Sequence, residues 1–217
     1  LGILANVLEI IQKNLPKLSS IYPDNEHKNL QKKIINYLDS GISYDSINIG
    51  NGATEIIYNF ARAFVGKQVI IPYPTFCEYE LASRKIGAKI KHVPLKDWKL
   101  DVDSISEKTR NSDAIFLCNP NNPTGLFSYD LVKKLVEKID HSIKILIDES
   151  FIEFVSEAKH PRSFIEKINE FRNVVVLRSL TKSFGLAGLR LGYCVSHPSV
   201  AKKLSHNKIT WNINGLA

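Results

Sequence analysis

Short apolar runs rich in β-branched residues alternate along the chain with longer segments in which apolar positions recur about every three to four residues. The short runs predict buried strands, and the amphipathic segments predict helices. We expect strands at 46–49, 68–71, 88–93, 114–118, 144–147, 174–177 and 191–195. We expect helices at 4–14, from Asp24 or Asn25 to 38, and at 53–64, 76–85, 101–108, 128–139, 161–169 and 198–206.

This alternation of strands and helices predicts an α/β fold with a mostly parallel, doubly wound sheet flanked by helices. Pro16 is expected to end the first helix, because a proline inside a helix removes a backbone hydrogen bond. Ser128 is expected to cap the helix that follows it. We find no internal repeat, low-complexity tract or linker, so we treat 1–217 as one domain, with 1–22 leading into it.

Polar or aromatic segments directly follow five of the predicted strands. They are 50–55, 72–76, 119–125, Asp148 and 179–182. Ligands of open α/β sheets bind outside the carboxyl ends of the strands, so these segments predict one shared site. The strand order does not follow from the sequence, and this convergence is therefore an inference.

Each of these segments has a chemical and a structural interpretation. The turn at 50–55 (GNGATE) opens a helix whose free N–H groups suit a phosphate, but it could be a plain tight turn. It matches neither a dinucleotide-binding fingerprint nor a Walker loop. Lys182, beside Ser179 and Arg190, could be an amine nucleophile at an anion site or one more solvated lysine. Prolines and a glycine make 119–125 a rigid turn without explaining its three asparagines.

Asp148 follows four apolar residues and should be only partly solvated, so its carboxylate needs a cationic or hydrogen-bonding partner. A helix cap and a metal ligand are the alternatives. We expect no metal, because Glu149 is the only suitable ligand close to it in the sequence.

Composition narrows the class of protein. The 217 residues, 44% hydrophobic and 24% charged, are typical of a globular protein, with no apolar run of membrane-spanning length. The net charge of +7 favours anionic partners, but the basic residues are scattered in pairs, so we expect no nucleic acid and no membrane partner. Cys77, Cys118 and Cys194 lack metal-ligand or redox spacing, which predicts free thiols in a reducing cytoplasm.

The chain begins at Leu1, contains no methionine, and stops at Ala217 without a recognisable final element. We therefore expect a fragment of a longer protein.

Taken together, the segments after the strands resemble fold type I pyridoxal-phosphate enzymes, specifically the class I/II aminotransferase family. The matching segments, in family order, are GNGATE (50–55), PTF (74–76), NPNNPTG (119–125), DE (148–149), SLTK (179–182) and GLRLGY (188–193). The resemblance covers most of the chain. It implies that 1–217 is the large, cofactor-binding domain, and that an N-terminal arm and a C-terminal small domain are missing.

The resemblance also implies a role for each site residue around pyridoxal 5'-phosphate. Lys182 would form the Schiff base with the cofactor aldehyde and then move a proton, and Asp148 would keep the pyridinium nitrogen protonated. Phe76 would stack on the ring, and Asn122 would bind the ring hydroxyl oxygen. The phosphate would be held by Ala53 and Thr54 backbone N–H groups and by Ser179, Thr181 and Arg190. Tyr22 resembles a tyrosine that reaches the phosphate of the neighbouring subunit, which implies a homodimer.

Within the family, the chain most resembles histidinol-phosphate aminotransferases and the threonine-phosphate decarboxylases of cobalamin biosynthesis. The substrate would be a phosphorylated amino acid or amino alcohol. The aminotransferases usually carry DEAY where this chain has DESF (148–151), so the tyrosine hydroxyl is absent here, as in the decarboxylases. FCEY (76–79), LRSLTK (177–182) and WNINGLA (211–217) also look more like the decarboxylases, which we therefore favour from the sequence.

Two other hypotheses remain. The chain could be the aminotransferase-like ligand-sensing domain of a transcriptional regulator, with a DNA-binding domain upstream, or an unrelated α/β fold that binds a nucleotide. The family grips the substrate carboxylate with an arginine from the small domain. We therefore expect the 217-residue chain alone to bind cofactor weakly and to be inactive.

Overall fold

The computed structural model describes residues 2–155 and 162–217. The strands are β1 (Ile47–Asn51), β2 (Gln68–Tyr73), β3 (Lys89–Pro94), β4 (Ala114–Cys118), β5 (Lys144–Asp148), β6 (Val174–Ser179) and β7 (Leu191–Ser196). The α-helices are α1 (Ala5–Leu18), α2 (Lys28–Leu38), α3 (Gly52–Phe64), α4 (Glu78–Lys85), α5 (Val102–Glu107), α6 (Tyr129–Lys138), α7 (Leu180–Ser183) and α8 (Pro198–Ser205). Short 3₁₀ helices are η1 (Tyr44–Ser46), η2 (Ile152–Phe154), η3 (Phe164–Lys167) and η4 (Ala187–Leu189).

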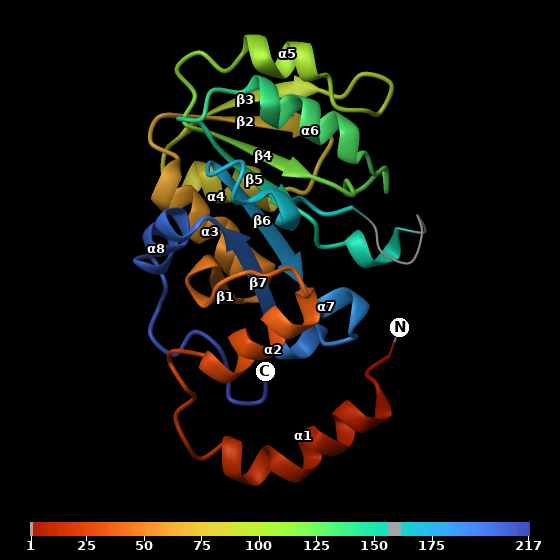
Figure 1. The fold of residues 1–217 in the computed structure, drawn as a ribbon, viewed down its shortest axis with the longest axis vertical. Helices are drawn as coiled ribbons and strands as arrows, with labels where there is room; N and C mark the ends of the chain where they lie inside the picture. The colour runs from red at the N-terminus through yellow and green to blue at the C-terminus, as the bar shows by residue number, and fades with distance from the viewer. Residues whose placement is uncertain (1, 156–161) are drawn as a thin grey trace.

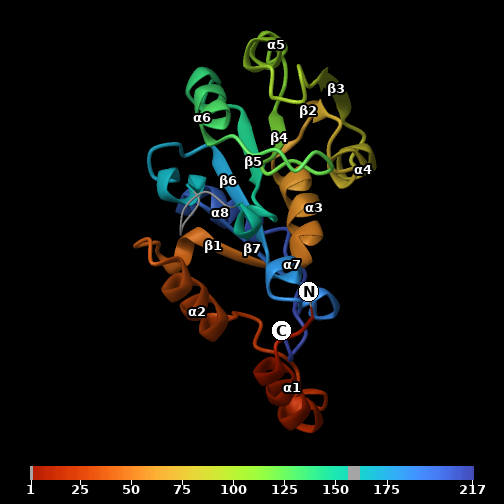
Figure 2. The same cartoon turned by 90° about the vertical axis from the view of Figure 1, so that its right-hand side faces the viewer.

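The described strands form one sheet in the order β1-β7-β6-β5-β4-β2-β3. β7 runs antiparallel to β1 and β6, and the pairs from β6 to β3 are parallel. Helices cover both faces: α3 and α4 lie on one side of the sheet, and α2 and α6 on the other (Figures 1 and 2). The doubly wound, mostly parallel sheet predicted from the sequence is confirmed.

Alternate residues of each central strand enter two separate cores. Phe116, Leu146 and Leu177 pack with α3 and α4, whereas Leu117 and Ile147 pack with the α6 side. Buried parallel strands place side chains on both faces with a period of two, so every position of β4 is apolar and buried. The same alternation decides which side each polar residue takes at the carboxyl ends of these strands.

Helix α1 lies at one end of the molecule, close to both termini (Figure 1). None of its residues is buried, and Leu4, Leu8, Ile10 and Leu15 are exposed on it or at its start. In the described ranges, 2–155 and 162–217, no helix combines the length and apolarity that a membrane span needs.

The sequence-based boundaries differed most from the structure in three places. α1 continues past Pro16 to Leu18, because a proline in the last turn disturbs few helical hydrogen bonds. α2 begins at Lys28 after His27, although Asp24 Oδ2 still accepts from the Lys28 N–H. Of the helix predicted at 161–169, the structure shows only the 3₁₀ helix η3, which is capped by Ser163 and has Phe164 and Ile165 buried. Residue 161 of that prediction lies outside the described residues.

Candidate active site

A pocket lies at the carboxyl ends of β4, β5 and β6, beside the start of α3. Its lining residues are Ala53, Thr54, Phe76, Cys118, Asn122, Asp148, Ser150, Phe151, Ser179, Thr181, Lys182 and Arg190. Every site residue named from the sequence is among them except Tyr22. From the sequence, we inferred that the segments after the strands converge on one site. The tertiary structure shows this convergence.

Asp148 ends β5 on the pocket face and is only 3% exposed. Its Oδ2 accepts a hydrogen bond from the Tyr79 hydroxyl at 2.7 Å, and its Oδ1 accepts one from the Ser150 N–H at 2.9 Å. Both donors are neutral, and burial raises the pKa of Asp148. A buried carboxylate with neutral donors and an open pocket in front of it suits a ligand that brings its own positive charge.

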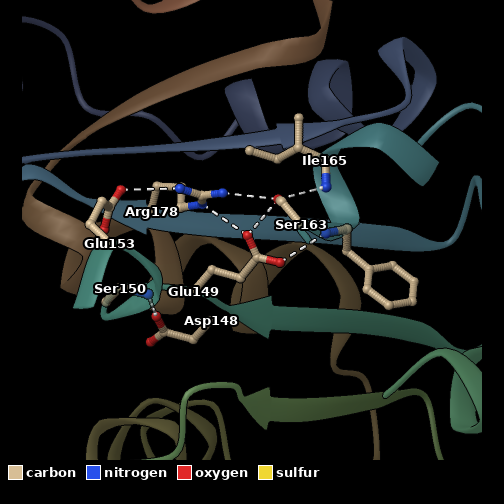
Figure 3. A network of polar contacts seen from close by, with 8 residues as sticks. Asp148, Glu149, Ser150, Glu153, Ser163, Ile165 and Arg178 are labelled. Atoms are coloured by element: carbon tan, nitrogen blue, oxygen red, sulfur yellow. Dashed lines mark hydrogen bonds and ion pairs between the residues drawn. The ribbon is translucent and has the colours of Figure 1, made fainter. Parts of the chain in front are cut away.

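Glu149 points to the opposite face, because consecutive strand residues alternate (Figure 3). Its Oε2 accepts from Arg178 Nε at 2.9 Å and from the Ser163 hydroxyl at 2.7 Å. Arg178 Nη1 also donates to Glu153 Oε1 at 3.1 Å. This cluster of Glu149, Glu153, Ser163 and Arg178 ties the ends of β5 and β6 together behind the pocket. Glu149 thus has a structural partner, while its neighbour Asp148 faces the pocket.

The start of α3 and the segment around Arg190 form a cradle for an anion. The first N–H groups of a helix have no intrahelical partner, so those of Ala53 and Thr54 are free to bind. Gly52 has φ +75°, and a Cβ on it would lie 2.5 Å from Arg190 Nη2. A Cβ on Gly192 would lie 2.5 Å from the Ala53 nitrogen. Only glycine at these two positions lets the guanidinium and β7 approach the helix start this closely.

Ser179 and Thr181 complete this cradle from β6 and α7. Their hydroxyl oxygens are 2.7 Å apart, and Ser179 Oγ accepts from the Thr181 N–H at 3.3 Å. Arg190 itself adopts φ +58°, a left-handed conformation that few non-glycine residues adopt.

The structure explains two of the three asparagines in the turn after β4. Asn119 Oδ1 accepts from the Ser128 N–H at 2.9 Å. Asn121 Nδ2 donates to the Pro74 carbonyl at 3.1 Å, and Asn121 Oδ1 accepts from Thr75 at 3.0 Å. These two hold the turn against neighbouring loops. Asn122 lines the pocket, where its amide is available to a ligand.

Lys182 lies in the short helix α7 and is exposed on the pocket wall. Its positive charge is one of the influences that lower the pKa of Asp148 against burial. Phe76 lines the same pocket and contacts the Tyr79 ring edge-on, at 5.7 Å between centroids. No cluster of three or more metal-ligating residues occurs in the part of the chain that the structure describes.

Tyr22 lies outside the pocket. It is 77% exposed and packs against Trp211, with ring centroids 4.5 Å apart. Its expected partner is a phosphate in another subunit, and the structure contains one chain. The role of Tyr22 therefore stays a prediction.

Sequence reasoning assigned no role to Tyr79, Cys118 or Ser150. Tyr79 follows Phe76 by three residues at the start of a predicted helix, a spacing that places two side chains on the same helix face. Its partner Asp148 is 69 residues away in sequence, so the contact could not be inferred without the strand order.

The comparisons with known proteins agree with this geometry. The family profile described as aminotransferase class I and II matches residues 3–215. A histidinol-phosphate aminotransferase from Halalkalibacterium halodurans is 34% identical over 207 residues, which cover 94% of this chain and 55% of that protein. The solved histidinol-phosphate aminotransferase of Clostridium acetobutylicum has a TM-score of 0.86 at 30% identity, over 99% of this chain and 63% of its own.

The L-threonine-O-3-phosphate decarboxylase of Porphyromonas gingivalis also has a TM-score of 0.86, at 26% identity, over 99% of this chain and 63% of that chain. The fold is thus that of the fold type I pyridoxal-phosphate enzymes, to which both of these solved structures belong. The chain belongs to the class I and II aminotransferase family, whose cofactor is pyridoxal phosphate. It spans 55–60% of the length of the first curated relatives that it matches.

Proposed function

We propose that this chain is the cofactor-binding domain of a pyridoxal-phosphate-dependent enzyme that acts on a phosphorylated amine. One observation carries the proposal: Asp148, Lys182 and the glycine-lined cradle beside Arg190 converge on one pocket. The buried carboxylate suits a protonated ring nitrogen, and the cradle suits a phosphate. These are the two charged ends of pyridoxal phosphate.

When bound, pyridoxal phosphate supplies an electron-withdrawing ring that stabilises the charge left at Cα when one of its bonds breaks. Residues of the chain would bind the cofactor and move the proton. Asp148 would keep a proton on the ring nitrogen, and Asn122 would bind the ring hydroxyl oxygen. Phe76 would pack against the ring, and the Lys182 amine would hold the cofactor and serve as the group that moves a proton. Ser179, Thr181, Arg190 and the start of α3 hold the phosphate.

Among the two candidate reactions, we propose transamination of histidinol phosphate first. Four histidinol-phosphate aminotransferases are 34–36% identical over 94–100% of this chain. A putative threonine-phosphate decarboxylase is 36% identical over 91% of it. The sequence alone favoured the decarboxylase, and one observation keeps that reaction as the second candidate. Phe151 lines the pocket at the position where the aminotransferases usually carry a tyrosine, so no hydroxyl is offered there.

The test uses the protein expressed from its complete reading frame. Borohydride reduction followed by peptide mass mapping should find the cofactor on the peptide that contains Lys182, and Lys182→Ala should abolish it. A wild-type protein without that adduct would remove the proposal. An adduct without turnover of either substrate would favour the ligand-sensing regulator.

The two reactions leave different products. With histidinol phosphate and 2-oxoglutarate, the aminotransferase forms glutamate. With O-phosphothreonine, the decarboxylase releases carbon dioxide and needs no 2-oxoglutarate. Carbon dioxide release without glutamate formation would reverse our order of preference.

We further propose that the enzyme is a cytoplasmic homodimer. Tyr22 is exposed outside the pocket of its own chain, and Leu8, Ile10 and Leu15 of α1 are exposed apolar residues at the same end of the molecule. The free thiols of Cys77, Cys118 and Cys194 suit a reducing compartment.

A further inference from the structure

Tyr79 is fully buried and held in place from several sides. Its ring stacks on Phe116, with centroids 5.1 Å apart and planes 12° from parallel, and it meets Phe76 edge-on. One turn later in α4, the Ser83 hydroxyl donates to the Tyr79 carbonyl at 2.7 Å. A large aromatic side chain packed this way has one rotamer available, so the direction of its hydroxyl is determined by the fold.

That hydroxyl points at Asp148 Oδ2, 2.7 Å away. The other carboxylate oxygen is held by the Ser150 N–H. Each oxygen of Asp148 therefore has one donor in the fold, and together these donors orient the carboxylate. Tyr79 contacts both Asp148 and Phe76, two of the pocket residues assigned to the ring of the cofactor.

We propose that Tyr79 is a positioning residue, whose hydroxyl fixes the orientation of the Asp148 carboxylate and holds it in the ionised form that a protonated ring nitrogen requires. This role of Tyr79 rests on the proposed function, whereas its hydrogen bond to Asp148 does not depend on any cofactor.

The surroundings of Asp148 explain why such a donor is needed. It faces Tyr79 from α4, Cys118 from β4, Ser150 from the following turn and Lys182 from α7. Burial raises the pKa of Asp148, and the hydrogen bonds from Ser150 and Tyr79 oppose that rise. Burial also raises the pKa of the Cys118 thiol to about 12, so this neighbour stays neutral. A protonated, neutral Asp148 could not serve as the counter-ion of the ring nitrogen.

Tyr79→Phe removes the hydroxyl and keeps the ring that packs on Phe116. Tyr58→Phe is the matched control, because the Tyr58 hydroxyl donates at 2.9 Å to Glu78, away from the pocket. In the cofactor-free full-length protein, carbon-13 NMR should show the Asp148 carboxyl titrating about one to two pH units higher in Tyr79→Phe than in wild type. The signal is assigned by its loss in Asp148→Asn. Equal midpoints in Tyr79→Phe and Tyr58→Phe would overturn the proposal.

A second measurement uses cofactor binding. Tyr79→Phe should weaken pyridoxal-phosphate binding by about tenfold, and nitrogen-15 NMR of labelled cofactor should show its ring nitrogen shifted toward the unprotonated form. In an Asp148→Asn background, the same substitution should change cofactor affinity by less than about twofold. An equal loss of affinity in both backgrounds would show that Tyr79 acts only through packing, against the proposal. A wild-type protein that binds no cofactor would refute the proposed function, and the titration would still decide the role of Tyr79.

Discussion

Glu149 and Arg178 form an ion pair on the face of the sheet opposite the pocket, with Arg178 Nε 2.9 Å from Glu149 Oε2. Both side chains are almost fully buried, at 2% and 8% exposure. The residues on their pocket side, Asp148 and Ser179, belong to the site. The carboxyl ends of β5 and β6 therefore each carry one residue that lines the pocket and one that belongs to the ion pair on the opposite face of the sheet.

Removing the cation should destabilise the fold strongly. Arg178→Ala leaves the buried Glu149 and the partly buried Glu153 without their shared partner, and breaking the buried pair with Glu149 costs about 3–5 kcal/mol. Chemical denaturation should show this loss in the free energy of unfolding. Arg172→Ala, at an exposed arginine, is the control and should change that free energy by less than about 0.5 kcal/mol. Equal effects of the two substitutions would contradict the anchoring role.

Gly192→Ala should disturb the anion cradle. The new Cβ would lie 2.5 Å from the Ala53 nitrogen and 2.8 Å from the Gly52 carbonyl carbon, and both neighbours are backbone atoms. The start of α3 must shift, which should destabilise the fold by about 1–3 kcal/mol and weaken the binding of pyridoxal phosphate. Gly188→Ala is the matched control, since its Cβ would meet nothing within 4 Å. Thermal denaturation and fluorescence titration would measure the two effects, and a Gly192→Ala protein with wild-type affinity would refute the cradle.

Asp148→Asn should move stability and cofactor affinity in opposite directions. The pKa of Asp148 is raised in the folded protein, so folding is favoured by its protonated form, and this contribution is lost as pH rises through the folded pKa. The cofactor-free variant, which carries no charge at this position, should therefore gain stability over wild type as pH rises from about 4 toward neutrality. The Ser150 N–H can still donate to the asparagine oxygen, and the asparagine NH₂ can donate to the Tyr79 hydroxyl oxygen.

Without its carboxylate, the same variant should bind pyridoxal phosphate more weakly. Denaturation curves at several pH values and a binding titration measure both effects. A stability difference that is constant from pH 4 to 7 would contradict the assigned direction of the pKa shift.

Tyr22 and Lys182 offer a test of the dimer. If Tyr22 serves the neighbouring subunit, then Tyr22→Ala and Lys182→Ala impair the same site from different chains. Refolding the two inactive full-length variants together should restore activity, because in a mixed dimer one site receives both wild-type residues. Random pairing would make about a quarter of all sites intact. Mixtures that stay inactive would place Tyr22 outside the active site of the partner.

Much of the fold could be predicted from the sequence because its strands are short, apolar and clearly separated. The predicted strand at 114–118 matches β4 to the residue, and Ser128 does cap α6. The described part of the predicted helix, 162–169, was predicted poorly, because Ser163 and Phe164 bond Arg178 and Glu149, each 15 residues away in sequence. Local periodicity carries no information about such contacts.

The sequence by itself determined the family, the kind of sheet and the residue types of the site, because these depend on local patterns and on motifs in a fixed order. Only the tertiary structure decided which polar residues face the pocket. Strand alternation and strand order place Asp148 beside Tyr79 and send Glu149 to Arg178 on the other face. Two adjacent carboxylates therefore have different surroundings, since a strand turns consecutive side chains in opposite directions.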